Sequence, residues 1–111
     1  MLRQISDTEA SILLRTLDVG ANEPIPASLL AQVSSLKVTA TCGCGCPTIW
    51  FGPDGRATNG HLIAEAYAPG SEGNITIIVW SIADSVVGLE FVHADDGHLP
   101  DPSSVKGYSS S

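Results

Sequence analysis

Residues 75–93 read "ITIIVWSIADSVVGLEFVH" and contain the two strongest β segments of the chain. Both segments are rich in β-branched and aromatic side chains, which favour strands. They are joined by a short turn around residues 83–85, so we expect them to pair as a tight antiparallel hairpin. Alternation in the second segment places Val87, Leu89 and Phe91 on one face, which we expect to point into the core.

The opposite face of this hairpin is also apolar. It is predicted to carry Ile78, Trp80, Val86 and Val92. Such a face is either covered by another layer of the protein or left as an apolar patch for a partner or a second copy of the chain. The sequence therefore predicts a candidate interaction surface made of these four residues.

Three further segments extend the predicted sheet toward the N-terminus. "LKVTATC" (36–42) and "HLIAEAYA" (61–68) alternate between apolar and other residues, as strands that are covered on one side do. "PTIWF" (47–51) is short and largely apolar, and the "GPDG" that follows it is a strong turn signal. Together with the hairpin, these segments predict a mostly antiparallel sheet of about five strands.

The N-terminal third is predicted to be helical. Ser6 and Glu9 have the spacing of a capping box, which marks the start of a helix over residues 7–18. A second, shorter helix is expected after Pro24 and Pro26. The two helices are expected to turn the following residues inward: Ile12, Leu13, Leu14 and Leu17 from the first, and Leu29, Leu30 and Val33 from the second.

These patterns predict a single α+β domain over residues 1–102, with two N-terminal helices packed on the sheet. The length of 111 residues suits one hydrophobic core. Residues 103–111, "SSVKGYSSS", are predicted to form a polar, disordered C-terminal tail.

The chain is acidic, with 12 acidic and 5 basic residues, and no Lys or Arg lies between Arg56 and Lys106. Because binding to nucleic acid requires basic residues that displace counterions from phosphates, the composition argues against a nucleic-acid partner. An acidic surface can attract a basic protein partner, although the same charge also keeps a protein soluble. A protein partner, or self-association, is therefore expected.

The first 20 residues lack the features of a signal peptide. No stretch reaches the roughly 20 apolar residues that a membrane span requires. We expect a cytoplasmic protein that has no membrane partner and whose cysteines are reduced.

Cys42, Cys44 and Cys46 alternate with glycines in "CGCGCP". We expect "GCG" to form a three-residue hairpin loop, since glycine supplies the positive φ that such loops need. Cys42 and Cys46 would then face each other, near enough to bridge when oxidised or to hold zinc or another soft metal with help. A strand that ran straight through the three cysteines would hold the thiols too far apart to share one ion.

A metal site at these cysteines needs further ligands, and the available histidines are His61, His93 and His98. None of them stands at a zinc-type spacing from the cysteines. Packed cysteines without chemistry, a metal site and a thiol-disulfide role all remain open. The acidic run "HADDGHLPD" (93–101) is better explained as a surface turn than as a cation site.

The string "CGCGCPTI" (42–49) follows a helical N-terminus and precedes the segments "LEF" (89–91) and "LPDP" (99–102). This arrangement resembles a set of short bacterial proteins without an assigned activity, in which a CGCGCP-type stretch precedes an antiparallel sheet. The resemblance implies one intact domain and no catalytic residue.

Two functions are compatible with these features. The first is a small interaction module without catalytic activity, as immunity proteins and adaptors are, and the charge and the second apolar face favour it. The alternative is a metal- or thiol-site protein that uses Cys42, Cys44 and Cys46. No catalytic or cofactor-binding residue is predicted.

Overall fold

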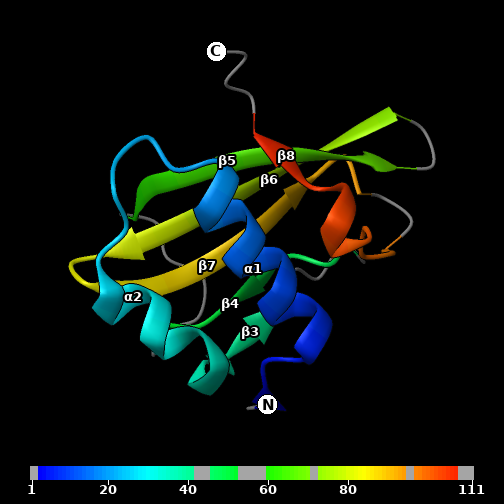
Figure 1. Cartoon of the computed structure of the whole chain (residues 1–111). Helices are drawn as coiled ribbons and strands as arrows, with labels where there is room; N and C mark the ends of the chain where they lie inside the picture. The colour runs from blue at the N-terminus through cyan, green and yellow to red at the C-terminus, as the bar shows by residue number, and fades with distance from the viewer. Residues whose placement is uncertain (1–2, 42–45, 53–59, 71–72, 95–96, 108–111) are drawn as a thin grey trace.

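The computed structural model describes residues 3–41, 46–52, 60–70, 73–94 and 97–107 (Figure 1). The chain forms the predicted α+β fold, in which helices cover one face of an antiparallel sheet. This sheet has six strands rather than about five, and a separate two-stranded sheet lies beside it in the described chain.

The six strands follow the order β3-β4-β7-β6-β5-β8. Their bounds are β3 (Ala40–Thr41), β4 (Ile49–Trp50), β5 (His61–Gly70), β6 (Gly73–Ile82), β7 (Ser85–Val92) and β8 (Lys106–Gly107). The predicted hairpin is confirmed as β6 and β7, which pair antiparallel up to Ile82 and Ser85. Ala83 adopts a positive φ of 54° in its two-residue turn, as tight hairpin turns require.

The predicted strand over residues 36–42 is divided between the two sheets. Its first part is β2 (Lys37–Val38), which pairs with β1 (Arg3–Gln4). Its second part is β3, which pairs with β4 in the main sheet. Between them, the Thr39 amide donates to the Trp50 carbonyl at 2.8 Å, so this segment ties the small sheet to the large one.

The two helices are α1 (Asp7–Val19) and α2 (Ala27–Gln32), and the 3-10 turn η1 (Val33–Ser35) continues α2. The predicted capping box is confirmed. The Glu9 amide donates to the Ser6 hydroxyl at 3.1 Å, and the Ser6 amide donates to the Glu9 carboxylate at 2.9 Å. The helix therefore begins where the sequence predicts, because the cap satisfies amides that have no partner within the helix.

Leu14 and Leu30 were both expected to point inward, and this prediction is wrong. Their side chains are 42% and 41% exposed, whereas Leu13 and Leu29 are buried. Successive side chains on a helix are turned by about 100°. Leu14 therefore lies about 100° beyond Leu13 and about 200° from the buried Ile12, which turns it away from the sheet. Leu30 is turned away from the buried Leu29 in the same manner.

Small residues let α1 lie close to β5. Ala64, Ala66 and Ala68 present fully buried side chains to the core side of this strand. At the end of α1, a Cβ on Gly20 would collide with the Glu65 carbonyl. In its absence the Glu65 amide donates to the Gly20 carbonyl at 3.0 Å, which fixes the end of the helix against the strand.

The fold extends beyond the predicted domain end at residue 102. The turn η2 (Pro102–Ser104) and β8 follow it, and β8 pairs with β5. Val105 is fully buried in the core, and its carbonyl accepts a hydrogen bond from the Arg15 Nε atom at 3.1 Å. Residues 103–107 are therefore part of the domain and not of a tail, because one buried valine anchors an otherwise polar segment.

Leu13 and Leu14 offer a direct test of the orientation of α1. Leu13→Ala is expected to lower the free energy of unfolding by about 2–5 kcal/mol, because it opens a cavity in the core. Leu14→Ala is expected to cost less than about 1 kcal/mol, because much of the Leu14 side chain is exposed. Urea denaturation of both variants measures the difference. Equal losses in the free energy of unfolding would contradict this orientation, because they would mean that Leu14 is buried as deeply as Leu13.

Arg3 and Glu9 predict how stability depends on pH. Two hydrogen bonds of 2.8 Å join the Arg3 guanidinium to the two Glu9 carboxylate oxygens. Burial alone would raise the pKa of Glu9, but the bonds from Arg3 and Ser6 outweigh burial and hold the pKa below its ordinary value of 4.5. The Glu9 carboxylate thus contributes stability above that value, and the contribution is lost as the pH falls through the lowered pKa.

Arg3→Ala is expected to raise the pKa of Glu9, because the two hydrogen bonds from Arg3 are removed while the bond from the Ser6 amide stays. The stability advantage of the natural chain over this variant should be largest near neutral pH and should shrink on acidification below about pH 4.5. Urea denaturation across this range measures the effect, with Lys106→Ala as a control that removes a cation elsewhere. An advantage that is independent of pH would contradict the assigned pKa.

Candidate interaction surface

The four residues of the predicted interaction surface do not share one face. Ile78, Trp80 and Val92 are half-buried on the face of the sheet that points away from the helices. Val86 belongs to the core and is 2% exposed. A β-bulge between Trp80 and Ser81 changes the register, so that Val86 pairs with Ser81 on the side of the helices.

Aromatic packing fills part of this outer face. Trp50 pairs with Gly88 on β7, and Gly88 pairs with Trp80 on β6. A Cβ on Gly88 would lie 2.5 Å from the Trp50 ring and 3.4 Å from the Trp80 ring, so the absence of a side chain makes room for both indoles. The Trp80 Nε1 atom also donates to the Glu90 carboxylate at 2.9 Å. The two indoles are thus engaged with the sheet itself.

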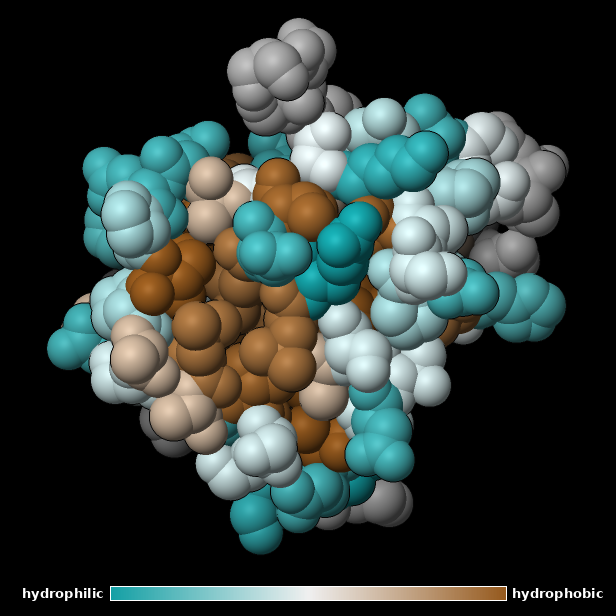
Figure 2. All heavy atoms as spheres, viewed as in Figure 1, coloured by the Kyte–Doolittle hydropathy of each residue, from teal (hydrophilic) through white to brown (hydrophobic). Residues whose placement is uncertain are grey.

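The most exposed apolar side chains lie elsewhere. Among the described large hydrophobic residues, the exposed ones are Leu14, Leu30 and Leu62, at 42%, 41% and 38%. Leu14 is on α1, Leu30 is on α2 and Leu62 is at the start of β5, and all three line hollows around the connecting segment 21–26. Figure 2 shows apolar side chains gathered between the two helices, with hydrophilic residues at their border.

The first hollow is a groove between α1 and α2 with a volume of about 510 Å³. Leu14 and Leu17 line it from α1, Leu30 from α2 and Ile25 from the connecting segment. A second hollow of about 460 Å³ lies on the other side of this segment and includes Leu62. Residues 22–25 line both hollows, so the two hollows adjoin along this segment.

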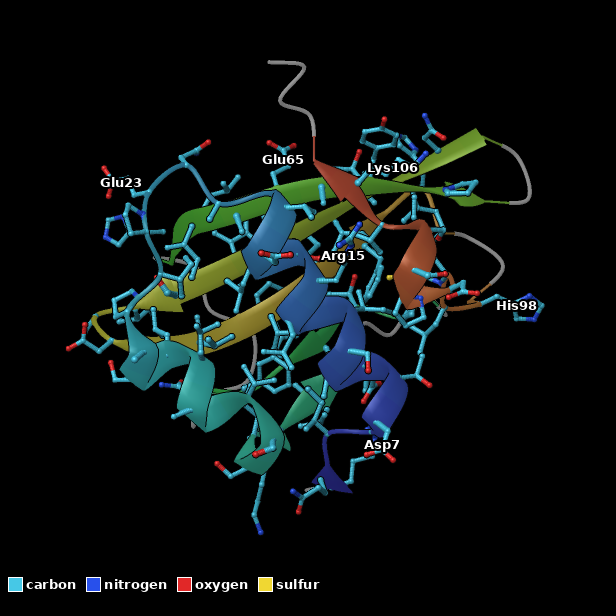
Figure 3. All side chains as sticks on the ribbon, viewed as in Figure 1. Asp7, Arg15, Glu23, Glu65, His98 and Lys106 are labelled. Atoms are coloured by element: carbon cyan, nitrogen blue, oxygen red, sulfur yellow. The ribbon has the colours of Figure 1, made fainter. Side chains whose placement is uncertain are left out.

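The groove has an acidic border. Asp18 and Glu23 line it, and both residues are exposed. Glu23 points away from the body of the protein (Figure 3). Asp18 lies 3.8 Å from Arg15, whose Nε atom is engaged by the Val105 carbonyl. Asp18 thus has an ion-pair partner in Arg15, but both carboxylates are exposed, so a basic group from outside the protein can compete with Arg15 for Asp18 and can reach Glu23.

This surface was missed because the leucines were assigned to the core. The signal that could have found it is the pair of adjacent leucines in each helix, Leu13-Leu14 and Leu29-Leu30. In each pair the structure buries the first leucine and leaves the second on the flank of the helix.

The cysteine stretch is described only in part, since Cys42 and Cys44 lie outside the described residues. Cys46 is half-buried, and its Sγ atom donates to the Thr48 hydroxyl at 3.4 Å. The Thr48 hydroxyl accepts from the Phe91 amide at 2.9 Å, which anchors this segment to β7. No group of three or more His, Cys, Asp or Glu residues that could hold a metal ion occurs within the described part of the chain.

The β3–β4 pairing also bears on the predicted hairpin. Strands β3 and β4 are antiparallel, but Thr41 pairs with Ile49. A hairpin in which Cys42 faces Cys46 requires Thr41 to pair with Pro47 instead. The register of the described strands thus differs by two residues from the predicted one, and Pro47 and Thr48 precede β4 rather than forming part of it.

The comparisons with known proteins add no relative. No family model, no curated protein and no solved structure matches this chain. Of the helices that the structure describes, none has the length and apolar character needed to cross a membrane.

Proposed function

We propose that this protein is a small interaction module that binds a protein partner and does not catalyse a reaction. The observation that carries this proposal is the exposure of Leu14 and Leu30, which line one groove between α1 and α2. Apolar side chains that stay exposed together are typical of binding sites, because a partner gains free energy by removing them from water.

The charge of the chain supports a basic partner. The net charge is −7, and the groove has Asp18 and Glu23 at its border. Such a surface speeds the approach of a positively charged protein and disfavours acidic ones. It also disfavours contact between two copies through this groove, since the acidic borders would repel each other.

A photo-cross-linking amino acid in place of Leu30 tests the proposal. In cells of the source organism, we expect a cross-linked product with one defined partner, because position 30 would lie inside the interface. The same amino acid in place of Thr8, an exposed residue in the first turn of α1, is the matched control and should give no such product.

A second substitution separates binding from misfolding. Leu14→Glu on the background of the cross-linker at position 30 should abolish the product, while circular dichroism shows a folded protein. The proposal is overturned if position 30 gives no product that position 8 lacks, or if Leu14→Glu leaves the product unchanged.

A metal- or thiol-site protein that uses Cys42, Cys44 and Cys46 is the alternative function that we carry forward. The spacing of the three cysteines in the sequence favours it, and of the three the structure describes Cys46, whose Sγ atom donates to the Thr48 hydroxyl next to β7. A soft metal such as zinc would need further ligands beside these thiolates.

Elemental analysis of protein purified under reducing conditions tests this alternative. If the cysteines hold zinc, about one metal ion per chain should be found, and Cys46→Ser should lower that content. Chelation should then also lower the thermal stability, because binding of a structural metal is coupled to folding. Metal well below stoichiometric amounts, with no effect of chelation, would rule out the metal site.

A further inference from the structure

We propose that the groove between α1 and α2 binds an amphipathic helix that carries Lys or Arg beside its apolar face. This inference rests on the proposed function and names the chemistry of the partner at that site.

The walls of the groove favour a helix over an extended peptide. They consist of side chains from α1 and α2 and of the connecting segment, in which Pro24 lines the groove and has no amide proton. None of the described residues that line the groove belongs to a strand, so an extended peptide would find no sheet edge to join there. A helix satisfies its backbone internally and needs only apolar contacts from the walls, as in other helix-in-groove complexes.

The position of the groove also suits a helix. Both α1 and α2 lie on the same face of the sheet, and the apolar patch lies between them (Figures 1 and 2). Helix α1 packs against η1, beyond the end of α2, whereas Leu14 and Leu30 face the groove. A bound helix would join the helical layer that already covers the sheet.

The length of the groove sets the size of the bound segment. On α1 and beyond, its lining runs from Leu14 to Ala21, which corresponds to about two helical turns. A helix of two to three turns presents apolar side chains at positions i, i+4 and i+7 along one stripe. Those side chains would contact Leu14, Leu17 and Leu30.

The charge at the border selects a basic helix. Among the described residues that line the groove, Asp18 and Glu23 are charged and none is basic. A second copy of the chain would bring its own acidic groups against this border, which is unfavourable. An anionic lipid surface would also repel the acidic border. Lys or Arg on the flank of a helix would instead pair with the carboxylates, which also fixes the direction of binding.

A synthetic peptide tests this inference with the full chain. The probe is an acetylated and amidated helical peptide of about 14 residues, with leucines along one stripe and lysines on both flanks. Titration at about 0.15 M salt, followed by methyl signals of the isotope-labelled protein, should show saturable binding with shifts at Leu14, Leu17 and Leu30.

Leu30→Ser is expected to lower the affinity of the protein for the peptide by about tenfold, which corresponds to a loss of about 1.4 kcal/mol in binding free energy. Leu62→Ser is the matched control, because Leu62 is similarly exposed but lies in the neighbouring hollow. It should leave the affinity unchanged within about twofold. Circular dichroism and thermal melting show that both variants are folded.

Charge reversal tests the role of the acidic border. Asp18→Lys should lower the affinity for the peptide by about fivefold. Replacing the lysines of the peptide with glutamates should lower the affinity by a similar factor. Asp7→Lys changes the net charge by the same amount at the other end of α1 (Figure 3), and it should have a much smaller effect. Equal effects of the two variants would show binding to overall charge and would overturn the inference.

Other outcomes also overturn it. These are an absence of saturable binding, shifts confined to residues outside the groove, dimerisation that competes with the peptide, or tight binding to vesicles of phosphatidylserine and phosphatidylcholine. If the cross-linker at position 30 captures a partner through a segment that is not a basic amphipathic helix, this inference fails and the proposed function stands. If position 30 captures nothing, the proposed function itself fails.

Discussion

The close contact between α1 and β5 determines where the rest of the protein lies. Three alanines on β5 leave room for the helix, and a glycine at its end lets the backbones of helix and strand bond directly. With one side of α1 held this closely, Ile12, Leu13 and Leu17 are buried. Leu14 is left on the flank of the helix, where it becomes one wall of the groove.

The two faces of the sheet use apolar residues for different purposes. On the outer face, Trp50 and Trp80 fill the space above Gly88, so apolar character there stabilises the sheet. On the other side, the helices bury most of the core but leave Leu14 and Leu30 in contact with water. Of the described apolar side chains on these two faces, the most exposed therefore lie beside the helices, whereas those on the outer face of the final hairpin are half-buried.

Local signals in the sequence predicted the elements well. The capping box at Ser6 and Glu9 placed the start of α1, and the branched residues on both sides of Ala83 placed the β6–β7 hairpin. These signals depend on neighbours along the chain, which is why they can be read without a structure.

The site depended on features that local patterns do not contain. A bulge at Trp80 moved Val86 to the core face, and a second irregularity between Leu62 and Ala64 left Leu62 exposed. Alternation alone cannot show where a strand gains a residue. Likewise, the burial of Val105 requires a partner strand 40 residues earlier in the chain, so a polar segment concealed the last strand.

The segment after α1 has two parts that differ in how freely their residues can be substituted. Gly20 and Ala21 pair with β5 and cover part of its edge, so these two positions are constrained by the sheet. Asn22, Glu23 and Pro24 are exposed and line both hollows. Substitution of these three surface residues could therefore change which partner is recognised, while the pairing of Gly20 and Ala21 with β5 stays the same.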